Sequence, residues 1–262
     1  MEASRLFLFP TIKEAICQNL DFEDADRLRV ALNLPSLKCS ISITDPTGKK
    51  IILPGIDPIS VKAYRLIKGY GLNLSLSTAV IIGDNLVVQT LIKVGADIEA
   101  FDTDGFTPIM LAAENGHDSV AQTLIERGAN INATGKFGYT ALMLAAKHGH
   151  NSIVQILISH KADVNAKTGN GFPALMWAAE SGQSLVVQTL IDNKADVNYA
   201  APNGFTALMM ASKSGHLETV KTLIANKANV NAVNNHRGTA LTLAYVNGRS
   251  QVAEYLKSIG AR

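Results

Sequence analysis

Cysteine is scarce in this chain of 262 residues, which contains only Cys17 and Cys39. Because neither lies near a cluster of Cys and His, the pair indicates neither a disulfide framework nor a zinc site. The simplest interpretation is two free buried thiols in a reducing compartment. Aromatic residues make up 6% and charged residues 18% of the chain, whereas apolar residues make up 47%. This composition excludes a disordered chain and favours a folded one.

Long runs of positive charge and long apolar runs are also missing. The formal net charge is only +2, so we expect no nucleic acid as a partner, since binding to phosphates depends on clustered Lys and Arg. No run of 18 apolar residues occurs, and the apolar run in the N-terminal MEASRLFLFP is too short for a signal peptide. We therefore expect a cytoplasmic location and no membrane partner.

What the sequence does contain is one block that recurs. GFTPIMLAAENGH begins at Gly105, and related blocks begin at Gly138, Gly171 and Gly204, each 33 residues after the previous one. A fixed period of this length indicates a repeat architecture, in which each unit buries its apolar face against its neighbours. One register runs from about residue 69 to the last residue of the sequence.

The copy that follows Gly138 predicts what each unit forms. TALMLAAKHG predicts a short helix that Thr140 caps and that Gly149 ends, because Gly adopts the left-handed conformation at the lowest cost. NSIVQILISH predicts a second helix, capped by Asn151 or Ser152, with apolar residues at helical spacing. The polar KADVNAKTGNG predicts an extended hairpin. The unit is therefore helix, turn, helix, loop.

These blocks resemble the ankyrin-repeat family, whose unit of 33 residues carries a Thr-Pro-Leu-His signature. The resemblance covers about residues 69–262 and implies an all-α ankyrin-repeat solenoid, a stack of helix-turn-helix-loop units with a small N-terminal cap of helices and a β-hairpin. We expect the cap at residues 1–60 and the array at 61–262. The array divides into a degenerate part at 61–101, repeats at 102–134, 135–167, 168–200 and 201–233, and a C-terminal capping repeat at 234–262.

The first 60 residues lack the repeat pattern. FPTIKEAICQNL and DFEDADRLRVALNL predict two short helices. Alternating Ile41 and Ile43, the turn DPTGK and then Ile51–Leu53 predict a β-hairpin. A repeat array needs a covered end, so a structural cap is one interpretation of this segment, and a small functional appendage is the other.

Methionine stands where the family signature places His. The family's His ties the loop to the Thr by a hydrogen bond that Met cannot make, so stability must come from packing. We interpret the methionines as core filler between repeats and not as metal or haem ligands. They are Met110, Met143, Met176 and Met209. Pro173 replaces the capping Thr in one copy and removes a capping hydroxyl.

No pattern of residues predicts catalysis, a cofactor or a metal. His117, His150 and His216 share the position after the helix-ending Gly. Neighbouring repeats lie roughly 8–10 Å apart, too far for their histidines to share a metal ion at about 2 Å from each. The Gly-x-Gly of KGYGLN lacks the context of a phosphate loop. We predict a protein without a catalytic residue, cofactor or metal site.

In the family, binding uses the loop tips, here including Phe137, and the exposed face of the first helices, which together form a concave groove. The resemblance thus implies an aromatic column and an apolar, exposed column centred on the only Trp, with charged residues beside them. The columns are Phe106, Tyr139, Phe172 and Phe205, and Leu144, Trp177 and Met210; the neighbouring residues are Lys136, Lys147, His148, Glu180 and Lys213. Packing between loops is the alternative role of the aromatic column.

The resemblance also implies a modification. The loop asparagine of ankyrin repeats is hydroxylated by an asparaginyl hydroxylase of host cells, which prefers a Leu eight residues earlier. The matching positions are Asn132, Asn165, Asn198 and Asn231, preceded by Leu124, Leu157, Leu190 and Leu223.

Our leading hypothesis is a monomeric, non-catalytic scaffold that binds a protein or peptide in its groove. The alternatives are binding through the N-terminal hairpin and helices with the repeats as support, a spacer without a defined partner, and an enzyme with a site in the N-terminal extension. The Met column and the richness in Ile, Asn and Lys favour a bacterial source. Ankyrin proteins of intracellular bacteria are often delivered into host cells, so an effector role is a further hypothesis.

Overall fold

The computed structural model describes residues 41–44, 48, 50–53 and 71–262. The chain divides into two compact units, Met1–Ala100 and Phe101–Arg262, and each is treated by itself below. The two helices predicted before residue 40, both cysteines and the first ten residues of the degenerate part, 61–70, lie outside the described residues.

The described part of the first unit begins with a β-hairpin. Strand β1 (Ile41–Thr44) pairs antiparallel with β2 (Lys50–Leu53), and Ile41 stands opposite Leu53. These are the two strands that the alternating isoleucines predict, so the hairpin prediction is confirmed at the level of its strands.

A helix pair follows in the same unit. Helix α4 (Leu72–Ile82) ends at Gly83, which is left-handed with φ of 80°. Helix α5 (Asn85–Lys93) is capped by the Asp84 carboxylate, which accepts a hydrogen bond from the backbone N–H of Val87 at 3.2 Å. This segment lacks the Thr-Pro-Leu block, and yet its apolar residues still form a helix pair of the repeat type.

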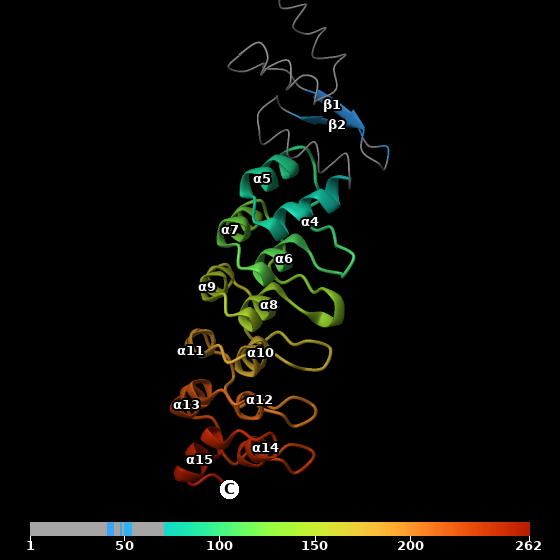
Figure 1. Ribbon diagram of the computed structural model, residues 1–262. Coiled ribbons are helices and arrows are strands. Elements are labelled where there is room, and N and C mark those ends of the chain that lie inside the picture. The colour runs from blue at the N-terminus through green and yellow to red at the C-terminus, as the bar shows by residue number, and fades with distance from the viewer. Residues whose placement is uncertain (1–40, 45–47, 49, 54–70) are drawn as a thin grey trace, which may run out of the picture. The chain divides into compact units, whose positions relative to one another are not determined.

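The second unit consists of helix pairs stacked in two layers. The first helices of the pairs contact one another along one layer, the second helices contact one another along the other, and the loops project beyond the first helices (Figure 1). The first helices are α6 (Pro108–Asn115), α8 (Ala141–His148), α10 (Ala174–Glu180), α12 (Ala207–Ser214) and α14 (Ala240–Val246). The second helices are α7 (Asp118–Glu126), α9 (Asn151–Ser159), α11 (Ser184–Asp192), α13 (Leu217–Ala225) and α15 (Ser250–Ser258). None of the helices in the described ranges combines the length and apolar character that a membrane crossing requires.

The core of the second unit lies between and along these layers. In α8, every residue from Ala141 to Ala146 is buried. The methionine column is at most 1% exposed, which confirms its interpretation as core filler. Burial of a side chain of this size contributes about 1.5–3 kcal/mol. Thr242 takes the Met position in α14 and is exposed, as expected for a helix at the end of its layer.

Thr140 caps α8 as predicted. Its hydroxyl accepts a hydrogen bond from the backbone N–H of Met143 at 3.3 Å, and Gly149 ends the helix in the left-handed conformation. The equivalent Pro173 makes no such bond, which confirms the loss of a cap there. Thr107 also makes no cap bond, and its buried hydroxyl has no hydrogen-bond partner.

The prediction that Asn151 or Ser152 caps the second helix is wrong. The N-cap of α9 is His150, and its side chain makes no cap bond. Instead, the ring Nε2 lies 3.0 Å from the carbonyl oxygen of Glu114 in the preceding repeat. His216 makes the same bond to Glu180, at 3.0 Å. This position therefore links successive repeats, and the sequence of one helix cannot show a partner that lies one repeat away.

The polar loops are tight turns with little strand structure. In one loop, Thr168 N–H donates to the Phe172 carbonyl at 3.1 Å, and a single bridge joins Lys167 to Pro173. The predicted hairpin is therefore present as a turn closed by backbone hydrogen bonds. Neighbouring loops are also joined, since Gly169 N–H donates to the Phe137 carbonyl at 2.8 Å.

Asparagines in the turns after the second helices form a series of hydrogen bonds between neighbouring repeats, which we call the asparagine ladder. Asn165 donates from Nδ2 to the Lys194 carbonyl at 3.1 Å, and its Oδ1 accepts from Asp196 N–H at 3.2 Å. Asn132 and Asn198 make the equivalent pairs of bonds, and Asn231 accepts from the backbone N–H of Arg262. The four asparagines thus hold each repeat to the next.

Candidate functional site

The candidate site is the side of the second unit from which the loops project. We call it the loop face. It consists of the exposed residues of the first helices α6, α8, α10, α12 and α14 and of the loops before them, at residues 101–106, 134–139, 167–172, 200–205 and 233–238. Its residues come from the loops and the first helices, and none comes from the second helices.

Three aromatic rings from two successive repeats meet on the loop face. The ring of Tyr139 lies 5.2 Å from that of Trp177, and the ring of Phe172 lies 5.8 Å from Trp177 in an edge-to-face arrangement. All three side chains are half-buried. These are favourable distances and orientations for aromatic pairs. Two members of the predicted aromatic column therefore pack against Trp177; Phe106 and Phe205, also half-buried, hold the same position in the first and fourth repeats.

The expectation that Leu144 and Met210 form an exposed column with Trp177 is wrong. Leu144 is 3% and Met210 6% exposed, so neither presents a surface to a partner. Both belong to runs of consecutive buried residues, Ala141–Ala146 in α8 and Ala207–Ser212 in α12. Trp177 is too large to be covered fully and reaches the surface between Tyr139 and Phe172.

Trp177 also carries an unpaired polar group. Its indole Nε1 is buried and has no hydrogen-bond partner. Leaving a buried donor unpaired costs about 1–3 kcal/mol. Lys147 lies above the same ring, with Nζ 5.7 Å from the ring centroid. This cluster of Tyr139, Phe172, Trp177 and Lys147 combines apolar area, a free donor and a cation.

Lysines on the loop face lie over aromatic rings. Lys136 places Nζ 5.3 Å from the ring centroid of Phe137, and Lys167 places Nζ 4.5 Å from that of Tyr199. Such contacts are attractive because the ring face is negative. Lys136 and Lys213 are exposed, and Glu180, at the end of α10, is half-buried. The predicted charged residues therefore do lie on this face.

Two groups on the loop face have shifted acidities. Burial raises the pKa of the Tyr139 phenol, and the Glu180 carboxylate adds to the rise. Burial lowers the pKa of the His148 imidazole, although Glu114, whose Oε1 lies 3.9 Å from Nε2, opposes the shift. Near neutral pH, Tyr139 is therefore a neutral hydrogen-bond donor and His148 is mostly uncharged.

Phe137 is an exposed aromatic residue of the loop face that belongs to neither of the two predicted binding columns. Its side chain is 72% exposed, and its backbone is left-handed with φ of 60°. The neighbouring loops carry Asp104, Asn170 and Asn203 at the position before the glycine. Aligning the repeats shows Phe137 as the one aromatic residue at this tip, so the signal was present in the sequence.

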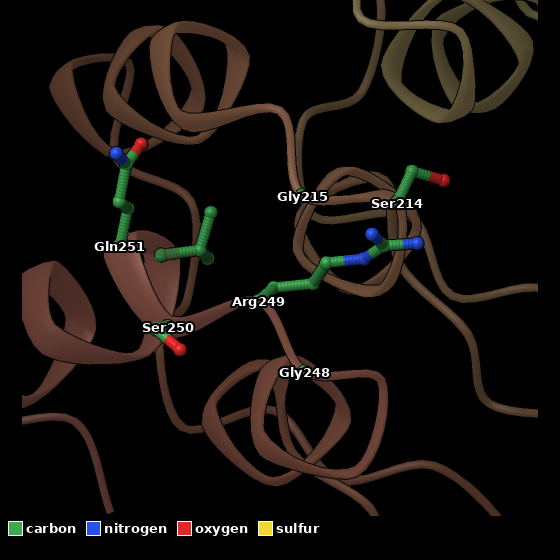
Figure 2. Close-up of a pocket in the computed structure, with 7 residues that line it drawn as sticks. Ser214, Gly215, Gly248, Arg249, Ser250 and Gln251 are labelled. Carbon is green, nitrogen blue, oxygen red and sulfur yellow. The ribbon is translucent and has the colours of Figure 1, made fainter.

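A cavity of about 290 Å³ lies away from the loop face, at the turns between the helices of the last two repeats. It is lined by Ser214, Gly215, Gly248, Arg249, Ser250, Gln251 and Val252. Figure 2 shows Arg249 extending from its turn past Gly215. Arg249 holds the register position of His150 and His216, and its Nε donates to the Lys213 carbonyl at 3.1 Å. The cavity therefore borders one of the contacts that link repeats.

Two models of protein families match the stacked units. One, described as ankyrin repeats in three copies, matches residues 134–201 and 175–262, and another, described as ankyrin repeats in many copies, matches residues 109–158. Together they cover more than half of the chain.

The chain belongs to the ankyrin-repeat family.

A comparison with curated proteins gives no match. Ankyrin repeats generally serve as non-catalytic modules for binding other proteins. In this ankyrin-repeat protein, large side chains and charges reach the surface together on the loop face.

Proposed function

We propose that this protein is a non-catalytic interaction scaffold that binds a partner protein or peptide on its loop face. The observation that carries the proposal is the half-buried cluster of Tyr139, Phe172 and Trp177, with the unpaired indole N–H at its centre. Interfaces draw most of their binding energy from a few aromatic and cationic residues grouped near the centre. This cluster lies in the second and third of the five helix pairs, close to the middle of the face.

We further propose that the chain is a monomer and that it acts in the cytoplasm. If the source is a bacterium that lives inside host cells, the same face would act on a host protein after delivery. The residue boundaries of the cap and repeats also remain predictions. Binding through the N-terminal hairpin and helices is the competing proposal, and it predicts that changes on the loop face leave binding intact.

Hydroxylation of the loop asparagines remains a prediction of the family resemblance. The amide groups of Asn132, Asn165 and Asn198 hold neighbouring repeats together, and the four side chains are exposed at the surface. Mass spectra of protein recovered from animal cells should show added oxygen on these residues, and spectra without it would contradict the prediction.

Affinity capture from lysates of host and source cells tests the role of the loop face. The wild-type chain is compared with a double variant, Phe172→Ala with Trp177→Ala. We expect a protein that the wild type retains to be lost from the double variant, because the variant removes two of the three rings of the cluster.

The matched control is Leu185→Ala. Leu185 lies in the same repeat, on helix α11, and is 67% exposed. This variant should retain the partner, and circular dichroism must show that both variants are folded. A partner that survives the double variant would contradict the proposal and direct attention to residues 1–60.

A further inference from the structure

The loop tip at Phe137 has a strained backbone, and its ring contacts Lys136 of the same loop. A left-handed backbone is rare for a bulky residue, whereas Asn and Asp adopt it more readily. The conformation allows the Phe137 carbonyl to accept the hydrogen bond from Gly169 in the next loop, a bond that requires no aromatic side chain. The ring itself is 72% exposed to water. Because most of the ring faces water, a partner that covers it would gain the free energy of burying that apolar area.

The loop face also has an uneven distribution of charge. From the second repeat onward, its loops and first helices carry five cationic side chains and a single carboxylate, that of Glu180. The cations are Lys136, Lys147, Lys167, Lys213 and Arg237. In the first repeat, residues 101–115 carry Asp102, Asp104 and Glu114 and no Lys or Arg. The face is therefore basic over most of its length and acidic at one end.

From these observations we infer that the partner is an extended acidic segment of a protein, anchored by an apolar side chain against Phe137 and with a basic residue at the end that meets the first repeat. The inference rests on the proposed function and specifies its partner. The four steps between five repeats, at roughly 8–10 Å each, correspond to about 10–12 residues of extended chain. Complementary charge fixes the direction in which such a segment lies.

Single-stranded nucleic acid is the competing ligand, because it also binds surfaces of cations and aromatic rings. The carboxylates argue against it. Glu180 lies close enough to Tyr139 to affect its titration, and Asp104 and Glu114 lie at the end of the face, where they would repel phosphates. A peptide with one basic end pairs with Asp104 and Glu114, whereas a uniform polyanion is repelled by them.

Fluorescence anisotropy tests the inference on the full chain. The probes are a peptide of about ten residues with Asp and Glu around a central Leu and a Lys at one end, a charge-inverted peptide, and an oligonucleotide of similar length. The acidic peptide should bind at least about tenfold more tightly than either other probe, and less tightly as salt is raised. Equal or tighter binding of the inverted peptide or the oligonucleotide, or no binding of the acidic peptide, would overturn the inference.

Charge-reversed variants locate the binding face. Lys136→Glu with Lys167→Glu should weaken binding of the acidic peptide by about tenfold or more. The matched control is Lys161→Glu with Lys194→Glu, which changes the net charge equally at exposed lysines outside the loop face. An equal loss in both pairs would mean that the effect is one of net charge alone, and would overturn the assignment to this face.

Phe137→Asn separates an anchor from a structural role. Asn adopts the left-handed backbone of this position more readily than Phe, so the melting temperature should stay the same or rise, while the acidic peptide binds about fivefold or more weakly. Unchanged binding would overturn the role of Phe137.

The two proposals can fail separately. If the Phe172→Ala, Trp177→Ala double variant loses its captured partner but the acidic peptide is not preferred, only the proposed partner class is wrong. If the double variant keeps that partner, the proposed function fails as well.

Discussion

Three lysines of this protein occupy a backbone position that favours glycine. Lys161, Lys194 and Lys227 have φ between 66° and 69°, and each stands just after the second helix of its repeat. Gly128, one period earlier, has φ of 90°, and a Cβ added there would meet no atom within 4 Å. Lysine therefore fits at this position, and its cost comes from the backbone alone.

Lys194→Gly should consequently stabilise the protein. The left-handed conformation costs a residue other than glycine about 1–2 kcal/mol, and the extra freedom of glycine in the unfolded chain offsets about half of this. We expect a gain of roughly 0.5–1 kcal/mol in the free energy of unfolding, measured by urea denaturation. Gly128→Lys should show a loss of similar size. A loss of stability in Lys194→Gly would contradict this interpretation.

At the scale of a single residue, the titration of His148 makes the stability of the folded protein depend on pH. Its folded-state pKa is lowered, so the unfolded chain takes up the proton first as pH falls. Its contribution to stability is thus present above about pH 6.5 and is lost as pH falls towards the lower pKa of the folded state. Glu114→Gln should lower that pKa further, as followed by NMR titration. Glu180→Gln should leave it unchanged, and a rise in Glu114→Gln would contradict the assigned role of the carboxylate.

At the scale of the helix, Thr140, Thr206 and Thr239 cap the first helices of their repeats, whereas Thr107 at the same repeat position makes no cap bond. Thr140→Ala should cost about 1 kcal/mol, because the backbone N–H of Met143 loses its partner. Thr107→Ala should change stability by less than about 0.5 kcal/mol, since the Thr107 hydroxyl makes no bond. Thermal or urea unfolding of both variants measures the difference. An equal loss of unfolding free energy in the two variants would show that the cap hydrogen bond of Thr140 does not contribute to stability.

The helices themselves could be predicted from the sequence, whereas some of their contacts could not. Thr140 and Gly149 mark the ends of α8 by local chemistry, so both were identified. The cap of α9 was not, because His150 bonds to a carbonyl of the preceding repeat. The burial of Leu144 was missed for a related reason, since it depends on the packing of α8 within the stack and not on the sequence of α8 alone.

At the scale of the whole second unit, the stack is held by links repeated at each step. Asn165→Ala removes two hydrogen bonds between neighbouring repeats, and we expect a loss of about 1–2 kcal/mol in the free energy of unfolding. The control is Asn170→Ala, an exposed residue of the next loop, which should change stability by less than about 0.5 kcal/mol. If the two variants unfold alike, the asparagine ladder does not contribute measurably to the stack.

The loop face is where prediction from sequence succeeded in outline and failed in detail. The repeat register placed Phe172, Trp177 and the lysines on one side of the molecule. It could not show that Tyr139 and Phe172 pack on Trp177, because ring contacts depend on how one loop lies against the next. Nor could it show the strained backbone of Phe137, which depends on the hydrogen bond to the following loop.

Amide hydrogen exchange is the measurement that tests the central claim most directly. Deuterium uptake is compared between the chain alone and the chain bound to the protein that it retains in affinity capture. The account predicts slower exchange in the loops at 134–139 and 167–172 and no change in helices α9 and α11. Protection confined to those second helices, or to residues 1–60, would contradict the claim that the loop face is the binding site.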